Sequence, residues 1–146
     1  MLTTLCVFCA SSRGGDTRYV AAARAFGELL ARSGRRIVYG GGKTGLMGAL
    51  ADGFVALPGG LGTLEEFAEI WTWGQLGLHQ KPYGLLDVSG YWTSLLAFLD
   101  HAVAEGFMRP EHRAMVCVAQ DAEALLEAMD HAPPPAMPKW LDRATT

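Results

Sequence analysis

Short apolar runs alternate with longer stretches of helical periodicity along most of the chain. Each run is four or five residues long and nearly continuous in apolar character, as in strands buried on both faces. This alternation predicts an α/β fold with a Rossmann-like, doubly wound parallel sheet flanked by helices. The expected strands are Leu5–Cys9, Arg36–Tyr39, Phe54–Leu57, Tyr83–Leu86 and Val116–Ala119, and the expected helices are Thr17–Arg32, about Gly45–Ala51, Leu64–Leu76, Tyr91–Glu105 and Ala122–Met129.

The ends of several helices carry recognisable signals. Ser33-Gly34 follows the first expected helix and Gly106 follows the fourth, as is typical of helix C-termini. Asp121 directly precedes the last helix, where it is a good N-cap. The final stretch, "APPPAMPKWLDRATT", is rich in proline and predicts irregular structure. We therefore expect a single Rossmann-like domain over residues 1–131 and a proline-rich tail over residues 132–146.

Three loops rich in glycine or serine follow the first three expected strands. They read "CASSRGG", "GGGKTG" and "PGGLGT". Because the carboxyl ends of parallel strands share one edge of a sheet, these loops are expected to lie together, where such folds bind ligands. Loops of this composition bring backbone N–H groups close to an anion. The pattern predicts a site for a small molecule that carries phosphate.

The second loop, "GGGKTG", matches two nucleotide-binding motifs only in part. A Walker A loop needs a glycine five residues before Gly42, where this chain has Ile37. The dinucleotide fingerprint fits Gly40, Gly42 and Gly45, but no acidic residue follows at the expected distance. A tight turn that packs a helix against the sheet explains these glycines equally well.

The third loop, "PGGLGT", combines glycines with the start of a helix. Gly59, Gly60 and Gly62 permit close approach of the backbone to a ligand. A helix that begins near Leu64 adds free N–H groups and the positive end of its dipole, and Thr63 adds a hydroxyl. Of the three loops, this one gives the strongest indication of an anion site.

Two glutamates follow this loop directly, and their roles stay open at this level. Thr63 and Glu66 have the spacing of a capping box, with Thr63 as N-cap and Glu66 at the third helical position. Glu65 and Glu69 are four residues apart on one helix face, where simple solvation explains them. Glu66 is thus either a helix cap or a carboxylate that acts on the ligand.

Composition narrows the possible functions. The chain has 146 residues, of which 50% are hydrophobic and 18% charged, as in a folded domain of this length. A net charge of −3 without any long basic run gives no reason to expect binding to nucleic acid. Nothing approaches eighteen consecutive apolar residues, so we expect no membrane span.

The chemistry of cysteine, histidine and lysine gives no sign of a cofactor or a metal. Cys6 and Cys9 form C-x-x-C within an expected strand, where residues three apart point to opposite faces and cannot share a metal, so buried thiols are favoured. With Cys117 the count is odd, and no export signal is visible, which favours the cytoplasm. The four histidines lack metal-binding spacing, and no lysine lies in a context that favours a cofactor Schiff base.

Taken together, the motifs resemble the LOG ("lonely guy") family of cytokinin riboside 5′-monophosphate phosphoribohydrolases. The similar segments are "CVFCASS", "VYGGGKTGLMG" and the long stretch from "ADGFVALPGGLGTLEEF" to "HAVAEGF", which contains the signature PGGxGTxxE. The resemblance covers most of Leu5 to Phe107. It implies hydrolysis of the N-glycosidic bond of a purine nucleoside 5′-monophosphate, such as AMP or a cytokinin nucleotide. We expect a homodimer or higher homo-oligomer that needs no cofactor.

The resemblance also implies a role for individual residues. Glu66, which ends the signature, would be the catalytic carboxylate, and Glu65 would bind the ribose hydroxyls. The expected substrate-binding residues are Ser11, Ser12, Gly41, Gly42, Gly59, Gly60, Gly62, Thr63, Glu65 and Thr72.

One departure from the family falls between Gly48 and Asp52. Relatives carry a longer helix, a further strand and a helix with an Arg-Lys pair there, whereas this chain joins the flanking motifs directly and places only fourteen residues between Tyr39 and Phe54. The sequence contains no arginine or lysine from Thr44 to Gln80. Either the protein has an internal deletion, or the sequence as written omits a segment. The alternative function is therefore a nucleotide-binding module with little or no catalysis.

Overall fold

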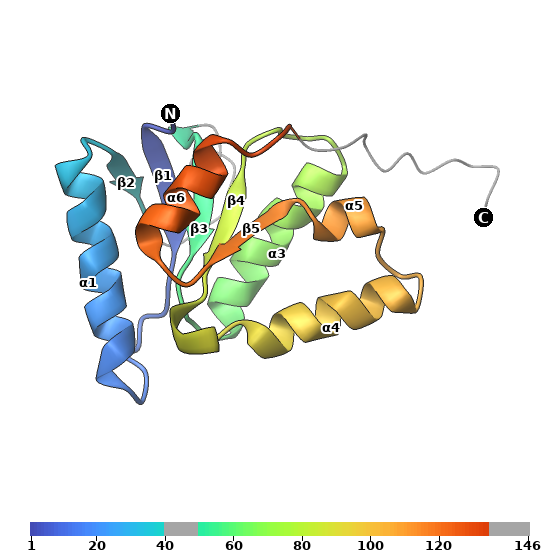
Figure 1. The fold of residues 1–146 in the computed structure, drawn as a ribbon, viewed down its shortest axis with the longest axis horizontal. Helices are drawn as coiled ribbons and strands as arrows, with labels where there is room; N and C mark the ends of the chain where they lie inside the picture. Colours follow the sequence, from blue (N-terminus) through green and yellow to red (C-terminus); the bar gives the residue numbers. More distant parts are fainter. Residues whose placement is uncertain (40–49, 135–146) are drawn as a thin grey trace.

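The computed structural model describes residues 1–39 and 50–134, which form a five-stranded sheet with helices on both faces (Figure 1). The strands are β1 (Thr4–Phe8), β2 (Arg36–Val38), β3 (Gly53–Ala56), β4 (Tyr83–Leu86) and β5 (Val116–Ala119). Their spatial order is β2-β1-β3-β4-β5, and each neighbouring pair is parallel. This order confirms the predicted α/β, Rossmann-like fold.

The helices lie in layers on either side of this sheet (Figure 1). Helix α1 (Thr17–Arg32) and helix α6 (Ala122–Asp130) cover one face, and α3 (Leu61–Gln75) covers the other. A 3-10 turn, η1 (Val88–Gly90), leads into α4 (Thr93–Ala104), and the short α5 (Pro110–Arg113) precedes β5. None of the helices in the described ranges is long and apolar enough to cross a membrane.

Alternation along the central strands divides the core into two halves. In β1, Cys6 and Phe8 point toward the α3 side, whereas Leu5 and Val7 point toward α1 and α6. All four are buried. Because both faces of the strand are covered, its sequence is apolar throughout, which explains why continuous apolar runs marked the strands.

Most of the expected elements are confirmed within one or two residues. The ranges of β4, β5 and α1 coincide with the expectation, and Gly34 (φ 68°) and Gly106 (φ 81°) follow helix ends as expected. Asp121 caps α6 by accepting a hydrogen bond from the N–H of Ala124 at 3.0 Å. Helix α5 was not expected, since four residues carry too little periodicity to be recognised.

The two cysteines of the C-x-x-C motif differ in burial. Cys6 is buried in β1, but Cys9 is exposed, because β1 ends at Phe8 and Cys9 already belongs to the following loop. The expectation of a buried Cys9 was therefore wrong. Most of the expected helix Gly45–Ala51 and most of the proline-rich tail lie outside the described residues, so that helix and the boundary between domain and tail stay predictions.

A partly buried ion pair and a hydrogen bond to the same carboxylate connect three segments that are distant in the sequence. Arg35, before β2, reaches Asp130 at the end of α6, with Nη2 2.6 Å from Oδ2, and their side chains are only 9% and 16% exposed. Asp130 Oδ1 also accepts a hydrogen bond from the N–H of Leu2 at 2.8 Å. Although burial of the carboxyl raises the pKa of Asp130, the bonds from Arg35 and Leu2 outweigh it and lower the pKa.

We expect Asp130→Asn to lower the free energy of unfolding by about 2 kcal/mol at pH 7, because it leaves a partly buried guanidinium without its charge partner. A carboxyl with a lowered pKa stabilises the fold above its unfolded-state pKa and loses that effect as pH falls, so the difference should shrink below about pH 4. Urea unfolding at several pH values measures it. Asp16→Asn is the control: its ion pair with Arg18 is exposed, and asparagine keeps the N-cap of α1, so stability should hardly change.

Candidate active site

The topology places the site between β1 and β3. In the strand order, β2 lies on one side of β1 and β3 on the other, so the connections run to opposite sides of β1 while all strands stay parallel. Ligands bind at the carboxyl ends of the strands at such switch points. The loop after β1 and the loop after β3 enclose a cavity of about 510 Å³ there, a size that suits a small molecule. The lining residues are Cys9, Ala10, Ser11, Ser12, Arg13, Gly14, Gly15, Tyr19, Val20, Ala23, Leu57, Pro58, Gly59, Gly60 and Tyr91.

Four of the predicted substrate-binding residues, Ser11, Ser12, Gly59 and Gly60, thus line one cavity. Ser12 lies in an exposed turn, where its Oγ accepts a hydrogen bond from the N–H of Gly14 at 3.2 Å. The chain enters α3 directly from Gly60, whose backbone is extended. The first N–H groups of a helix have no partner within the helix, and those of α3 begin at the cavity wall.

Gly59 is packed closely against the first turn of α3. A Cβ atom on Gly59 would lie 2.2 Å from Oγ1 and 2.7 Å from Cβ of Thr63, and the side chain of Thr63 is buried. Gly62 differs, because a Cβ added there meets nothing within 4 Å. Packing inside the protein therefore requires glycine at residue 59 and leaves glycine at residue 62 unexplained.

The expected capping box is wrong. Helix α3 begins at Leu61 rather than Leu64, its N-cap is Gly60, and no side chain caps it. The N–H of Leu64 already donates to the carbonyl of Gly60 at 3.0 Å. Thr63 cannot act as N-cap, because it lies inside the first turn with its side chain buried. Glu66 lies in the second turn, so it is not needed to complete the helix end.

Glu66 lies partly buried on α3, and its charge acts on Cys6 of β1. Burial of the carboxyl and the charges of Glu65 and Glu69 raise the pKa of Glu66 above its ordinary value. Burial and, to a lesser degree, the charge of Glu66 raise the pKa of Cys6 to about 11. Among the described residues, Glu66 has no hydrogen bond or ion pair that would compensate its charge. A half-buried carboxyl group whose surroundings disfavour its ionised form is typical of functional sites.

Glu66 and the remaining predicted residues are not among those that line the cavity. Glu65 is exposed on α3, and Gly62 and Thr63 lie in its first turn. Thr72 lies farther along α3, where its hydroxyl donates to the carbonyl of Ala68 at 2.8 Å and it lines a separate pocket. Gly41 and Gly42 are outside the described residues. The binding roles of these residues stay predictions.

Arg13 and Tyr91 are polar side chains of the cavity lining that sequence reasoning did not single out. Arg13 follows the serines of the first loop, and Tyr91 comes from the turn between β4 and α4. No motif marks Tyr91, because its place at the cavity depends on the sheet order rather than on neighbouring residues. The described residues contain no group of three or more histidine, cysteine, aspartate or glutamate side chains that could hold a metal ion.

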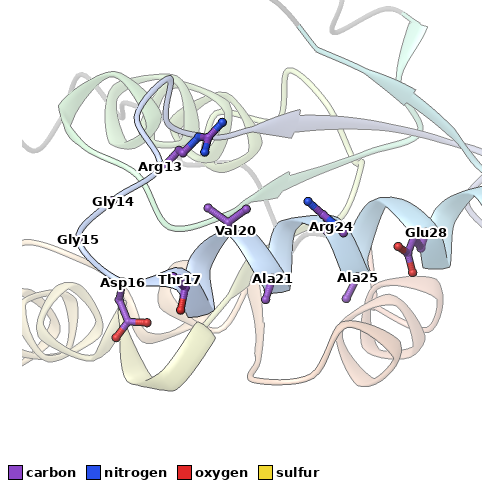
Figure 2. A pocket seen from close by; sticks show the side chains of 10 residues that line it. All are labelled: Arg13, Gly14, Gly15, Asp16, Thr17, Val20, Ala21, Arg24, Ala25 and Glu28. Carbon is purple, nitrogen blue, oxygen red and sulfur yellow. The ribbon is translucent and has the colours of Figure 1, made fainter.

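A second hollow, of about 620 Å³, runs beside the cavity along α1 and shares Arg13, Gly14, Gly15 and Val20 with it. Figure 2 shows Arg13, Val20 and Arg24 on one side of α1, whereas Asp16, Ala21 and Ala25 point to the other. Two guanidinium groups therefore stand on the side of α1 that carries Val20, a residue shared by both hollows.

Comparison with known proteins identifies a matching family and several similar proteins. Residues 43–129 match a family described as possible lysine decarboxylase. A probable cytokinin riboside 5′-monophosphate phosphoribohydrolase of Oryza sativa subsp. japonica is 37% identical over 88% of this chain and 84% of its own length. A second probable enzyme of this kind from rice is 38% identical over 90% of this chain and 73% of its own length. An Arabidopsis thaliana cytokinin riboside 5′-monophosphate phosphoribohydrolase is 36% identical over 89% of this chain and 83% of its own length.

These alignments are longer than the chain. The first rice protein aligns over 177 positions, although this chain has 146 residues in total. The relatives must therefore contain residues without a counterpart here.

Proposed function

Because the chain belongs to the LOG family of cytokinin riboside 5′-monophosphate phosphoribohydrolases, we propose that it hydrolyses the N-glycosidic bond of a purine nucleoside 5′-monophosphate. The products are the free base and ribose 5-phosphate. Candidate substrates are AMP and cytokinin-like nucleotides. The observation that carries the proposal is the cavity at the switch point, where the glycine loop before α3 meets the serine loop after β1.

In this proposal the site stabilises a negative charge at the phosphate end of the nucleotide and a developing positive charge at the sugar. The 5′-phosphate is received by N–H groups of the glycine loop and the first turn of α3, where the helix dipole favours negative charge. At the sugar, departure of the base leaves an oxocarbenium-like cation at the anomeric carbon. The carboxylate of Glu66 stabilises that cation or orients the attacking water, and Glu65 holds the ribose hydroxyls.

The raised pKa of Glu66 is consistent with this role. Without substrate, burial and neighbouring glutamates disfavour its negative charge. A positive charge that develops on the sugar reverses this penalty, so the carboxylate interacts more favourably with the transition state than with the neutral ground state. Differential stabilisation of this kind is what lowers a barrier.

The second candidate function is a nucleotide-binding module without turnover. Its support is the short connection between Gly48 and Asp52, where the family resemblance implies an Arg-Lys pair that this chain does not contain, together with the lack of a cationic partner for Glu66 among the described residues. Arg13 is the cationic side chain that the described cavity lining provides. The two candidates share the cavity and differ only in catalysis.

A single assay separates them. The purified chain is incubated with AMP and with isopentenyl-AMP, and free base and ribose 5-phosphate are followed by chromatography. Base release supports the hydrolase, whereas calorimetric binding of AMP without release supports the binding module. The intact mass should be measured on the same sample, since 15.7 kDa is expected for the chain as written and a larger value would reveal an additional segment.

We also propose that the protein is a homodimer that uses α3 and α4 and works in the cytoplasm. Support for the dimer comes from α4, which has no buried residue although most of its residues are apolar. Phe98 and Phe107 are 63% and 85% exposed. Light scattering should therefore give twice the chain mass.

Support for the cytoplasm comes from the three cysteines, all of which are free thiols.

A further inference from the structure

Tyr91 connects the two sides of the cavity through one hydrogen bond. Its hydroxyl donates to the carbonyl oxygen of Gly59, 32 residues earlier in the chain. Gly59 and Gly60 are consecutive glycines, so no side chain restrains the peptide between them. Because this peptide is planar and trans, fixing the direction of the Gly59 carbonyl also fixes the Gly60 N–H, which points the opposite way. Tyr91 therefore sets the orientation of a peptide at the entrance to α3.

The ring of Tyr91 is itself held on two sides. It makes edge-to-face contacts with Tyr19 of α1, at 5.5 Å between ring centroids, and with Trp92, at 4.9 Å. The N–H of Trp92 donates to the buried carboxylate of Asp87 at 2.6 Å. Tyr91 thus projects from an anchored turn rather than from a free loop.

The turn that presents Tyr91 contains the strained point of the described backbone. Ser89 has φ 53° and ψ 33°, and within residues 1–39 and 50–134 no other residue besides glycine has a positive φ. A left-handed conformation is unfavourable for serine and persists where the surroundings impose it. The strain follows β4 and immediately precedes the residues that bring Tyr91 to the cavity.

The other side of Gly59 is fixed by packing. Its Cα faces Thr63 so closely that a methyl group would not fit, while its carbonyl is engaged by Tyr91. We propose that Tyr91 is a positioning residue for nucleotide binding: it holds the Gly59–Gly60 peptide so that the N–H groups at the start of α3 receive the 5′-phosphate. This inference rests on the proposed function, since it names the residue that prepares the phosphate end of that site.

Tyr91→Phe tests the proposal, because it keeps the ring contacts and removes only the hydroxyl. We expect KM for AMP to rise about tenfold with kcat changed less than about twofold, since a single neutral hydrogen bond is lost before chemistry begins. Inhibition by inorganic phosphate should weaken in parallel, and inhibition by adenosine should not. In the ligand-free protein, amide hydrogen exchange over residues 57–64 should accelerate.

Tyr83→Phe is the matched control. Tyr83 is 1% exposed in the core, and its hydroxyl has no hydrogen-bond partner among the described residues, so KM and the exchange of residues 57–64 should stay at wild-type values. Wild-type exchange rates and KM in Tyr91→Phe would overturn the role of Tyr91. If the wild-type protein neither binds nor hydrolyses AMP, the proposed function fails instead, and the exchange comparison still decides whether Tyr91 orients the loop.

Discussion

Glu66→Gln should lower the rate of base release from AMP by about a thousandfold while leaving AMP binding within a few-fold of wild type. The substitution keeps the size of the side chain and removes the charge that faces the developing cation. Steady-state kinetics with chromatographic detection of the base measures the loss. The wild-type rate should also fall as pH drops through the pKa of Glu66, which burial and the charges of Glu65 and Glu69 raise above its ordinary value.

The same substitution should make the protein more stable at neutral pH. A carboxyl whose pKa is raised by folding prefers its protonated form in the native state, so the ionised form costs stability at every pH above that pKa. Glutamine removes this cost, and urea unfolding at pH 7 should show a higher midpoint. Loss of activity together with a gain in stability would distinguish a functional carboxylate from a structural one.

Glu69→Gln is the matched control for both effects. It removes a neighbouring negative charge on the same helix, so the acid limb of the rate profile should move to lower pH, with little change in rate well above it. A Glu66→Gln variant that releases base at the wild-type rate would overturn the catalytic role of Glu66. A variant that loses stability as well as activity would point to a structural role instead.

The fold could be predicted because its determinants are local in the sequence. Strands buried on both faces are continuously apolar, which gave β4 and β5 their observed ends, and the helix signals at Gly34, Gly106 and Asp121 work within one turn of chain. The glycine and serine loops could be assigned to one edge because parallel strands share a direction.

The start of α3 and the contribution of Tyr91 could not be predicted in this way. Capping preferences favour threonine over glycine, but in the structure Gly60 is the N-cap and Thr63 packs against Gly59 from inside the first turn. Tyr91 reaches Gly59 across a sequence separation of 32 residues, through a turn whose left-handed Ser89 no pattern signals. Both depend on tertiary contacts, which periodicity and spacing do not contain.

Gly59→Ala should cost about 3 kcal/mol of folding free energy and abolish measurable AMP binding. The added methyl would lie 2.2 Å from Oγ1 and 2.7 Å from Cβ of Thr63, whose side chain is buried. The backbone of the loop must therefore shift, and the hydrogen bond from Tyr91 and the N–H groups at the start of α3 shift with it. Urea unfolding and calorimetry measure the two losses. Wild-type stability in this variant would contradict the close packing on which the site geometry rests.

Gly62→Ala separates folding from ligand binding at the same helix end. A Cβ on Gly62 meets nothing within 4 Å, and alanine is the better helix former, so stability should rise by about 0.5 kcal/mol. If the backbone at Gly62 receives the phosphate, the same methyl occupies space that the ligand needs, and affinity for AMP should fall about tenfold or more. Because packing does not require glycine there, a more stable protein with weaker binding identifies ligand approach as the reason for it. Unchanged affinity would remove Gly62 from the phosphate site and leave Gly59 and Gly60 as the glycines that this loop contributes to it.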